Sequence, residues 1–188
     1  MTFWTDNTTE PKRQFRFLMD LTPSNSSEAI HSYYVRTVKK PQFQMDGTAE
    51  VKYIQHTFKY PGRITWQPID ITIIDPATPD SAAIMMNILA SAGYSAPFST
   101  LPTDQVKRSI SKAGSNNAMG GVVLKQIDAN GEPIEEWTLH NPFLTNVDFG
   151  TVGYDSDDLV EYTLTVDYDF ATLKSRGTLV TNAVATKS

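Results

Sequence analysis

Alternation of hydrophobic and polar residues predicts strands along much of the chain. From Gln14 to Leu21, aromatic and aliphatic side chains occupy every second position, starting at Phe15, which is the spacing of a strand with one buried face. The clearest alternation runs from Val160 to Phe170, with acidic and threonine residues between the apolar ones. Other β-prone runs cover residues 31–38, 64–66, 69–74, 122–127 and 134–140. The pattern therefore predicts a mainly antiparallel β protein.

A different periodicity predicts one long helix at residues 79–92. Thr78 is a suitable N-cap, Pro79 suits the first helical position, and Ile84 and Ile88 begin an apolar stripe that Gly93 ends. A second, shorter helix is expected from Thr103 to Ala113, ending at Gly114, and residues 115–119 are expected to be a polar linker.

The segment 43–60 predicts a projecting hairpin, because its apolar residues alternate with charged ones and cannot all face a local core. We place a turn at Met45-Asp46-Gly47 and another at Tyr60-Pro61-Gly62. At Pro68 the apolar positions change from even to odd numbers, which predicts a β-bulge, because proline cannot donate to a sheet. Further along the chain, Asn130-Gly131 predicts a tight hairpin turn.

The order of these elements predicts an α+β fold, mainly β, with an antiparallel sandwich or barrel-like body, one flanking helix and the projecting hairpin. We expect a single domain over residues 1–170. Residues 171–188 lack a strong period and are expected to form a loose C-terminal tail. The Ser- and Asn-rich stretch 22–28 is expected to be a loop.

Composition narrows the classes of protein. The 188 residues are 40% hydrophobic and 11% aromatic, enough for a substantial core, and no run approaches the roughly 20 apolar residues of a membrane span. The start of the chain lacks a signal-peptide pattern, so we expect a protein that is not exported and has no membrane segment. The absence of cysteine excludes disulfides and thiolate chemistry. A net charge of −5 is opposite to that of a nucleic-acid grip.

Residue patterns indicate no enzyme, metal site or cofactor. His31, His56 and His140 lie on separate predicted strands without metal-ligand spacing, and no Gly-x-Ser-x-Gly elbow is present. The acidic run at 155–158 lacks the glycine and the terminal glutamate of a calcium loop, so a solvated turn is the better interpretation.

Three segments in a fixed order carry a resemblance to a known family. The first contains Thr57-Phe58-Lys59-Tyr60-Pro61-Gly62, then Ile64-Thr65-Trp66, then the strand Ile71 to Asp75, and it runs directly into the capped helix. The second is Glu136 to Val147, with a break at Asn141-Pro142, and the third is Leu159 to Phe170 with its Asp167-Tyr168 ending. Together they resemble the tail tube proteins of contractile-tailed, T4-like bacteriophages over most of residues 14–170. The stretch 23–27 and the tail after Ala171 depart from the pattern.

The resemblance implies a subunit that forms hexameric rings, which stack into a hollow tube for genome ejection. Its implied partners are other copies of itself, a sheath protein outside, baseplate and terminator proteins at the tube ends, and DNA passing transiently through the lumen. The implied location is the virion tail, after synthesis in the host cytoplasm. An acidic subunit suits a conduit, because a wall of like charge repels phosphates.

Three surfaces are candidates for assembly. The acidic side of the last predicted strand, at Glu161, Asp167 and Asp169, is expected to face the lumen or a neighbouring subunit. The hairpin residues expected to reach an adjacent ring are Val51, Tyr53, Ile54 and Phe58. The cations expected to form an outer patch for the sheath are Lys107, Arg108 and Lys112.

Two alternatives remain open at this stage. The chain could be the tube protein of a phage-derived injection or secretion device, or a tube initiator at a baseplate, since these share the ring. It could instead be a monomeric β-sandwich that binds a small ligand or sugar through exposed aromatic residues. The aromatic residues of that site would be Tyr33, Tyr34, Tyr53 and Trp66.

Overall fold

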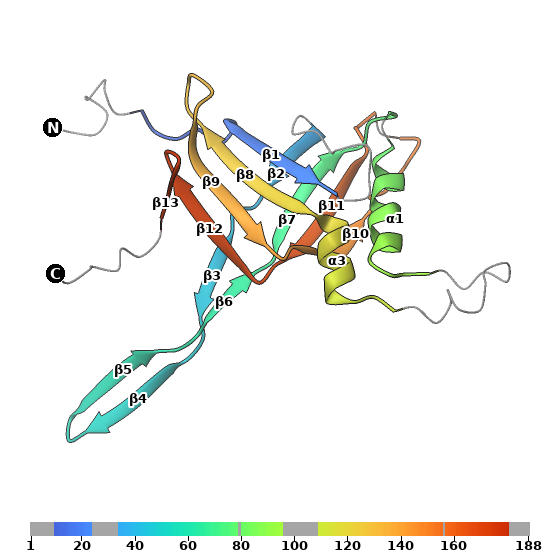
Figure 1. The fold of residues 1–188 in the computed structure, drawn as a ribbon. Helices are drawn as coiled ribbons and strands as arrows, with labels where there is room; N and C mark the ends of the chain where they lie inside the picture. Colours follow the sequence, from blue (N-terminus) through green and yellow to red (C-terminus); the bar gives the residue numbers. More distant parts are fainter. Residues whose placement is uncertain (1–9, 24–33, 79, 96–108, 156, 181–188) are drawn as a thin grey trace.

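In the described part of the chain, two antiparallel sheets pack face to face, with two helices at one side and a long hairpin extending from the body (Figure 1). The structure is a computed structural model that describes residues 10–23, 34–78, 80–95, 109–155 and 157–180. Neither sheet closes on itself among these residues, so the sandwich form of the prediction is confirmed and the barrel form is not. No helix in the described ranges is long and apolar enough to cross a membrane.

The first sheet contains five strands. In spatial order they are β1 (Phe17–Thr22), β8 (Gly121–Ile127), β9 (Pro133–His140), β12 (Phe170–Ser175) and β13 (Thr178–Leu179). Met19 pairs with Leu124 and Leu21 with Val122 across β1 and β8, and all four side chains are buried. The predicted alternation from Phe17 to Leu21 is therefore confirmed.

The second sheet contains four strands and supplies the most deeply buried residues. In order they are β10 (Phe143–Asp148), β11 (Glu161–Asp167), β7 (Ile69–Ile74) and β2 (Val35–Val38). Ile71 lies opposite Leu164 in the central pair, and both are fully excluded from water. Side chains from both sheets and both helices join in one hydrophobic cluster, so the sheets share a single core.

Two helices close one side of this core. Helix α1 (Ser81–Ser91) begins at Asp80, whose carboxylate accepts a hydrogen bond from the Ala83 N–H at 3.1 Å. The predicted helix is confirmed, but its N-cap is Asp80 and not Thr78.

Helix α3 (Lys112–Met119) corrects the prediction of a linker at 115–119. Its N-cap is Ser111, and its buried residues are Ala118 and Met119 at the C-terminal end. A helix-weakening residue lies inside it: a Cβ on Gly114 would come within 2.8 Å of the Ala92 carbonyl oxygen. Glycine is therefore required where α3 passes the end of α1, and the predicted helix end at Gly114 is wrong. Residues 103–108 of the predicted second helix lie outside the described residues.

The projecting hairpin is longer than predicted and reverses direction elsewhere. Its strands are β3 (Gln42–Met45), β4 (Thr48–Tyr53), β5 (His56–Pro61) and β6 (Ile64–Gln67), with β3 paired to β6 and β4 to β5. The chain turns at Ile54-Gln55. Asp46-Gly47 and Gly62-Arg63 face each other partway along, where the Asp46 N–H donates to the Arg63 carbonyl at 2.7 Å. A Cβ on Gly62 would lie 1.7 Å from the Asp46 carbonyl oxygen, so Gly62 allows the close approach of two continuous arms, whereas a Cβ on Gly47 would meet no atom within 4 Å. Neither predicted turn reverses the chain.

Two further expectations are corrected. Pro68 does not create a bulge within one strand, because β6 belongs to the hairpin and β7 to the four-stranded sheet. The change of parity therefore marks a transfer between sheets. The segment after Ala171 is also no loose tail over its first part, since β12 pairs with β9 from Phe170 to Ser175 and β13 follows. Residues 181–188 lie outside the described residues.

Candidate assembly surfaces

The hairpin carries one continuous apolar face. Cross-strand partners in an antiparallel pair project to the same side, and the register of β3–β6 continues into β4–β5 without a shift. Val51 pairs with Phe58 and Met45 with Ile64. The face consists of Phe43, Met45, Ala49, Val51, Tyr53, His56, Phe58, Tyr60, Ile64 and Trp66. We call these residues the hairpin face.

Most of the hairpin face is open to water. Val51, Phe58 and Tyr53 are 53%, 52% and 66% exposed, and Ile54 at the tip is 85% exposed. Burial of one such side chain stabilises a protein by about 1.5–3 kcal/mol. An isolated two-stranded hairpin is only marginally stable in water. The hairpin face therefore has the properties of a surface that is completed by a partner.

Only the root of the hairpin packs on the body. The Trp66 ring lies 6.0 Å from the ring of Tyr168, and Phe43 contacts Trp66 edge-on at 5.5 Å between ring centroids. Tyr168 belongs to the core, and burial raises the pKa of its phenol. These contacts fix the direction in which the hairpin leaves the sandwich (Figure 1).

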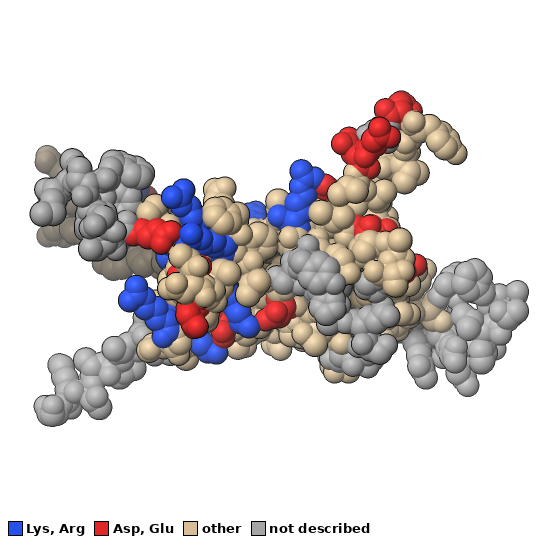
Figure 2. All heavy atoms as spheres, turned by 90° about the horizontal axis from the view of Figure 1, so that it is seen from above, with Lys and Arg blue, Asp and Glu red and all other residues tan. Residues whose placement is uncertain are grey.

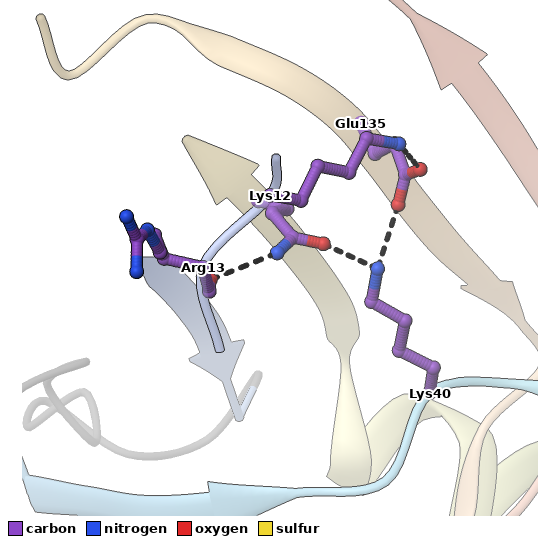
Figure 3. Close-up of polar contacts among 5 residues, drawn as sticks. Lys12, Arg13, Lys40 and Glu135 are labelled. Atoms are coloured by element: carbon purple, nitrogen blue, oxygen red, sulfur yellow. Dashed lines mark hydrogen bonds and ion pairs between the residues drawn. The ribbon is translucent and has the colours of Figure 1, made fainter. Parts of the chain in front are cut away.

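A polar network fastens the approach to the hairpin, as Figure 3 shows. The Lys40 ammonium, two residues before β3, donates to Glu135 Oε2 at 2.7 Å and also to the Gln126 side-chain oxygen. Lys12 donates to the other Glu135 oxygen, and the buried Gln126 amide donates to the Arg13 carbonyl at 3.1 Å. The network thus joins the N-terminal segment, the start of the hairpin and the first sheet.

The Glu135 carboxylate is the centre of this network. Burial by itself raises the pKa of Glu135, but hydrogen bonds from Lys12 and Lys40 and their positive charges outweigh it, and the pKa is lowered. Glu135 is therefore held in its ionised form. Sequence analysis missed this cluster because Lys12 and Lys40 lie 123 and 95 positions from Glu135, and no local pattern connects them.

The three predicted acidic residues do not form one bare acidic patch. Glu161, at the start of β11, forms an ion pair with Arg36 of β2. Asp167, six residues and roughly 20 Å along the strand, accepts a hydrogen bond from the Tyr168 N–H at 2.8 Å. Asp169 follows the strand and accepts from Lys112 and from Asn141, both at 2.7 Å. Two of the three carboxylates are therefore neutralised by a cation of the same chain.

Lys112 is the one residue of the predicted basic patch that the structure describes, and it is paired with Asp169. The hydrogen bond from Lys112 is the main cause that lowers the pKa of Asp169, followed by the hydrogen bond from Asn141. Lys112 thus ties α3 to the β11–β12 connection. Lys107 and Arg108 lie outside the described residues.

The aromatic residues of the ligand-binding alternative do not converge in the described part of the chain. Tyr53 lies beside the hairpin tip, where it pairs with His56, and Trp66 lies at the hairpin root. Ten residues, or roughly 30 Å of strand, separate His56 from Trp66. Tyr34 packs against the core, and Tyr33 lies outside the described residues. No group of three potential metal ligands occurs among the residues that the structure describes.

Comparisons with known proteins show the fold. No protein-family model and no curated protein sequence matches the chain. Among solved structures, a chain of the anti-feeding prophage baseplate superposes with a TM-score of 0.62 at 11% identity, covering 89% of this chain and 97% of that one. A chain from the tube-terminating cap of the same prophage gives 0.58 at 17% identity, covering 89% and 93%.

A third match is a chain from the sheath–tube complex of the PVC extracellular contractile injection system, with a TM-score of 0.55, 18% identity, and coverage of 88% and 92%. Identities this low establish fold and nothing finer. The expected likeness to contractile tail tube proteins is confirmed at that level: the chain shares the fold of chains from contractile injection systems.

Proposed function

We propose that this chain is a structural subunit of the inner tube of a contractile tail, assembling into hexameric rings that stack into a hollow conduit. The observation that carries the proposal is the hairpin face, an apolar surface on a two-stranded extension that the body does not cover. The shared fold with chains of contractile injection systems supports it.

The cargo defines the finer proposal. In a phage, the conduit passes the genome into the host, and the subunit belongs to the virion tail with a sheath outside and baseplate and terminator proteins at the ends. In a phage-derived injection device, the same rings deliver another cargo. Chains from contractile injection systems are among the solved structures that share this fold, which supports the injection-device version of the proposal.

Electron microscopy of the purified chain over a concentration series tests the common part of the proposal. We expect single subunits at low concentration and six-fold rings or hollow tubes at high concentration, because the association of copies follows mass action. Particles that stay monomeric at every concentration, and also in the presence of an isolated baseplate, would contradict it.

The hairpin face is proposed to insert between subunits of the adjacent ring. Replacing residues 46–63 by a two-residue Asn-Gly turn removes the outer part of this face and keeps its root at Phe43 and Trp66. We expect a subunit that stays folded, with a cooperative thermal unfolding transition, and that forms single rings without stacking. Tubes of normal length from this variant would exclude the hairpin from stacking.

The negative charge at the end of β11 can be tested separately. Asp167 is the one predicted acidic residue whose carboxylate has no cation partner in the described part of the chain. We propose that it faces the lumen or the neighbouring subunit. Asp167→Lys is expected to slow cargo release or to spoil the tube, and a variant with intact tubes and unchanged release would rule out this role.

The sheath-facing role of Lys107, Arg108 and Lys112 remains a proposal, weakened at Lys112 by its pairing with Asp169.

A further inference from the structure

A cleft of about 650 Å³ opens between the edges of the two sheets. Its walls combine three aromatic and three cationic side chains. They are Phe15, Phe17, Trp137, Lys12, Arg36 and Lys40. Phe15 is 74% exposed, so this wall is not filled by the chain's own residues.

Trp137 contributes apolar surface to the cleft, while its one polar atom is shielded from water. The Trp137 indole N–H is buried, and no described residue accepts its hydrogen bond. The cleft therefore offers aromatic surface beside a small excess of positive charge, because Lys12 and Lys40 share the single Glu135 carboxylate and Arg36 pairs with Glu161. This combination fits a segment that carries an apolar side chain and carboxylates.

The chain itself contains such a segment, in the connection between β10 and β11. Val152 and Leu159 are 81% and 69% exposed, and the Tyr154 side chain is fully exposed. Asp155 and Asp157 beside them form no ion pair with any described residue. We call Val152, Tyr154, Asp155 and Asp157 the acidic loop.

The base of the acidic loop is firmly held, so its exposure is a feature of the fold. Gly150 has a φ of 71° and donates to Asp148 at 2.9 Å, and a Cβ at this position would come within 2.6 Å of the Glu161 carbonyl. Phe149 packs edge-on against the buried Tyr162 at 5.3 Å. Tyr162 in turn donates to Asp75 at 2.6 Å, a hydrogen bond that raises the pKa of Tyr162 to about 12 and keeps the phenol protonated.

Charge separates the two features on the molecule. In Figure 2, acidic residues cluster on a projection that points away from the body, and many of the lysines and arginines gather over the other half. The tip of the loop projects from the body, while its base adjoins the cleft, since Arg36 lines the cleft and also a second hollow with Thr151 and Leu159. A projection and a complementary cleft that a chain does not fill itself are the elements of a heterologous, head-to-tail contact between identical copies.

We propose that the acidic loop of one copy docks in the cleft of the next copy, with Tyr154 against Phe15, Phe17 and Trp137 and the two aspartates near Lys12, Arg36 and Lys40. This inference rests on the proposed self-assembly and names one of its contacts. The contact is distinct from the hairpin face, so each copy makes two separate kinds of junction.

Disulfide trapping tests the contact directly, because the chain contains no cysteine of its own. Asp155→Cys in one preparation is mixed with Thr37→Cys in another, since Thr37 is exposed and lines the cleft. The matched control replaces Thr37→Cys by Asn130→Cys on the exposed β8–β9 turn. We expect mixed dimers to form about tenfold faster than in the control, because a docked loop holds the thiols at high effective concentration.

Charge reversal supplies an independent readout. Asp157→Lys is compared with Glu132→Lys, which makes the same change in net charge on the exposed β8–β9 turn. We expect about a tenfold higher concentration for assembly with Asp157→Lys only, and a smaller difference in high salt, where exposed charges are screened.

The outcomes separate this inference from the proposed function. If wild-type chains form rings, but trapping is no faster than in the control and Asp157→Lys assembles like Glu132→Lys, the contact is wrong and the tube function stands. A disulfide within a single chain carrying both cysteines at high dilution would also overturn the contact, because the loop would then close on its own cleft. If wild-type chains never assemble, the proposed function fails together with the contact.

Discussion

Ile54 combines an unfavourable backbone with full exposure of an apolar side chain. Its φ is 53°, a region that β-branched residues rarely enter, and its side chain is 85% exposed. Such a conformation costs about 1–2 kcal/mol, and the exposed side chain gains little from burial against the described residues. A strained apolar residue at the tip of an extension is the kind of feature that indicates a contact made elsewhere.

Ile54→Gly should therefore have opposite effects on the monomer and on assembly. We expect slower hydrogen exchange at the β4 and β5 amides in the monomer, because glycine adopts the positive φ without strain. We expect weaker stacking of rings, because the apolar contact is lost. If Ile54→Gly strengthens both the hairpin and the stacking, the tip is not a contact residue.

Glu135 predicts how the network at the hairpin root responds to acid. Its folded-state pKa is lowered, so the stabilisation is present above the pKa of the unfolded state and is lost as pH falls through the folded value. The change should appear below about pH 4.5, the ordinary value for a glutamate. Urea unfolding followed from pH 6 to pH 3 should show a steeper loss of stability for the wild type than for Glu135→Gln. Identical slopes would exclude a contribution from this carboxylate.

Among the elements, α3 shows how packing overrides local propensity. Its sequence, KAGSNNAM, contains a glycine and several polar residues that disfavour a helix, and we expected a linker there. The helix forms because Ala118 and Met119 are buried in the core, Ser111 caps its start and Lys112 pairs with Asp169. None of these tertiary contacts is visible in the local sequence.

Gly114→Ala tests this explanation. Alanine favours a helix by about 1 kcal/mol over glycine, but its Cβ would collide with the Ala92 carbonyl. Overpacking of this kind costs about 1–3 kcal/mol, so we expect lower stability in chemical denaturation. Asn117→Ala, at an exposed position of the same helix, should instead be neutral or slightly stabilising. A stabilising Gly114→Ala would show that the helices separate easily.

The strands illustrate which features a sequence can predict. Alternation located β1, β7 and β11 because each has one buried face, and Asn130-Gly131 located the turn between β8 and β9. The sequence predicts the hairpin but not its reversal, because the turn signals at Gly47 and Gly62 lie within the arms, and Gly62 allows the two arms to approach closely. The real turn contains Ile54 and Gln55, which carry no turn signal. Apolar residues at odd positions from 43 to 53 and at even positions from 56 to 66 are the pattern that would indicate the full hairpin face.

For the molecule as a whole, the candidate surfaces depend on contacts between distant parts of the sequence. The predicted acidic face is not one surface in the fold. Glu161 pairs with Arg36 and Asp169 pairs with Lys112, so the carboxylates form separate, partly neutralised sites. The cleft at Trp137 unites residues from four strands and linkers. Sequence patterns predicted the sandwich and its resemblance, while the charge arrangement required the three-dimensional fold.

The central claim is that copies of this chain assemble into rings that stack through the hairpin. The most direct measurement is electron microscopy of the wild type beside the variant in which residues 46–63 are replaced by a short turn, at matched concentrations. We predict hollow tubes from the wild type and unstacked rings from the variant. Wild-type particles that remain monomeric with and without a baseplate, or tubes that form equally well without the hairpin, would contradict the account.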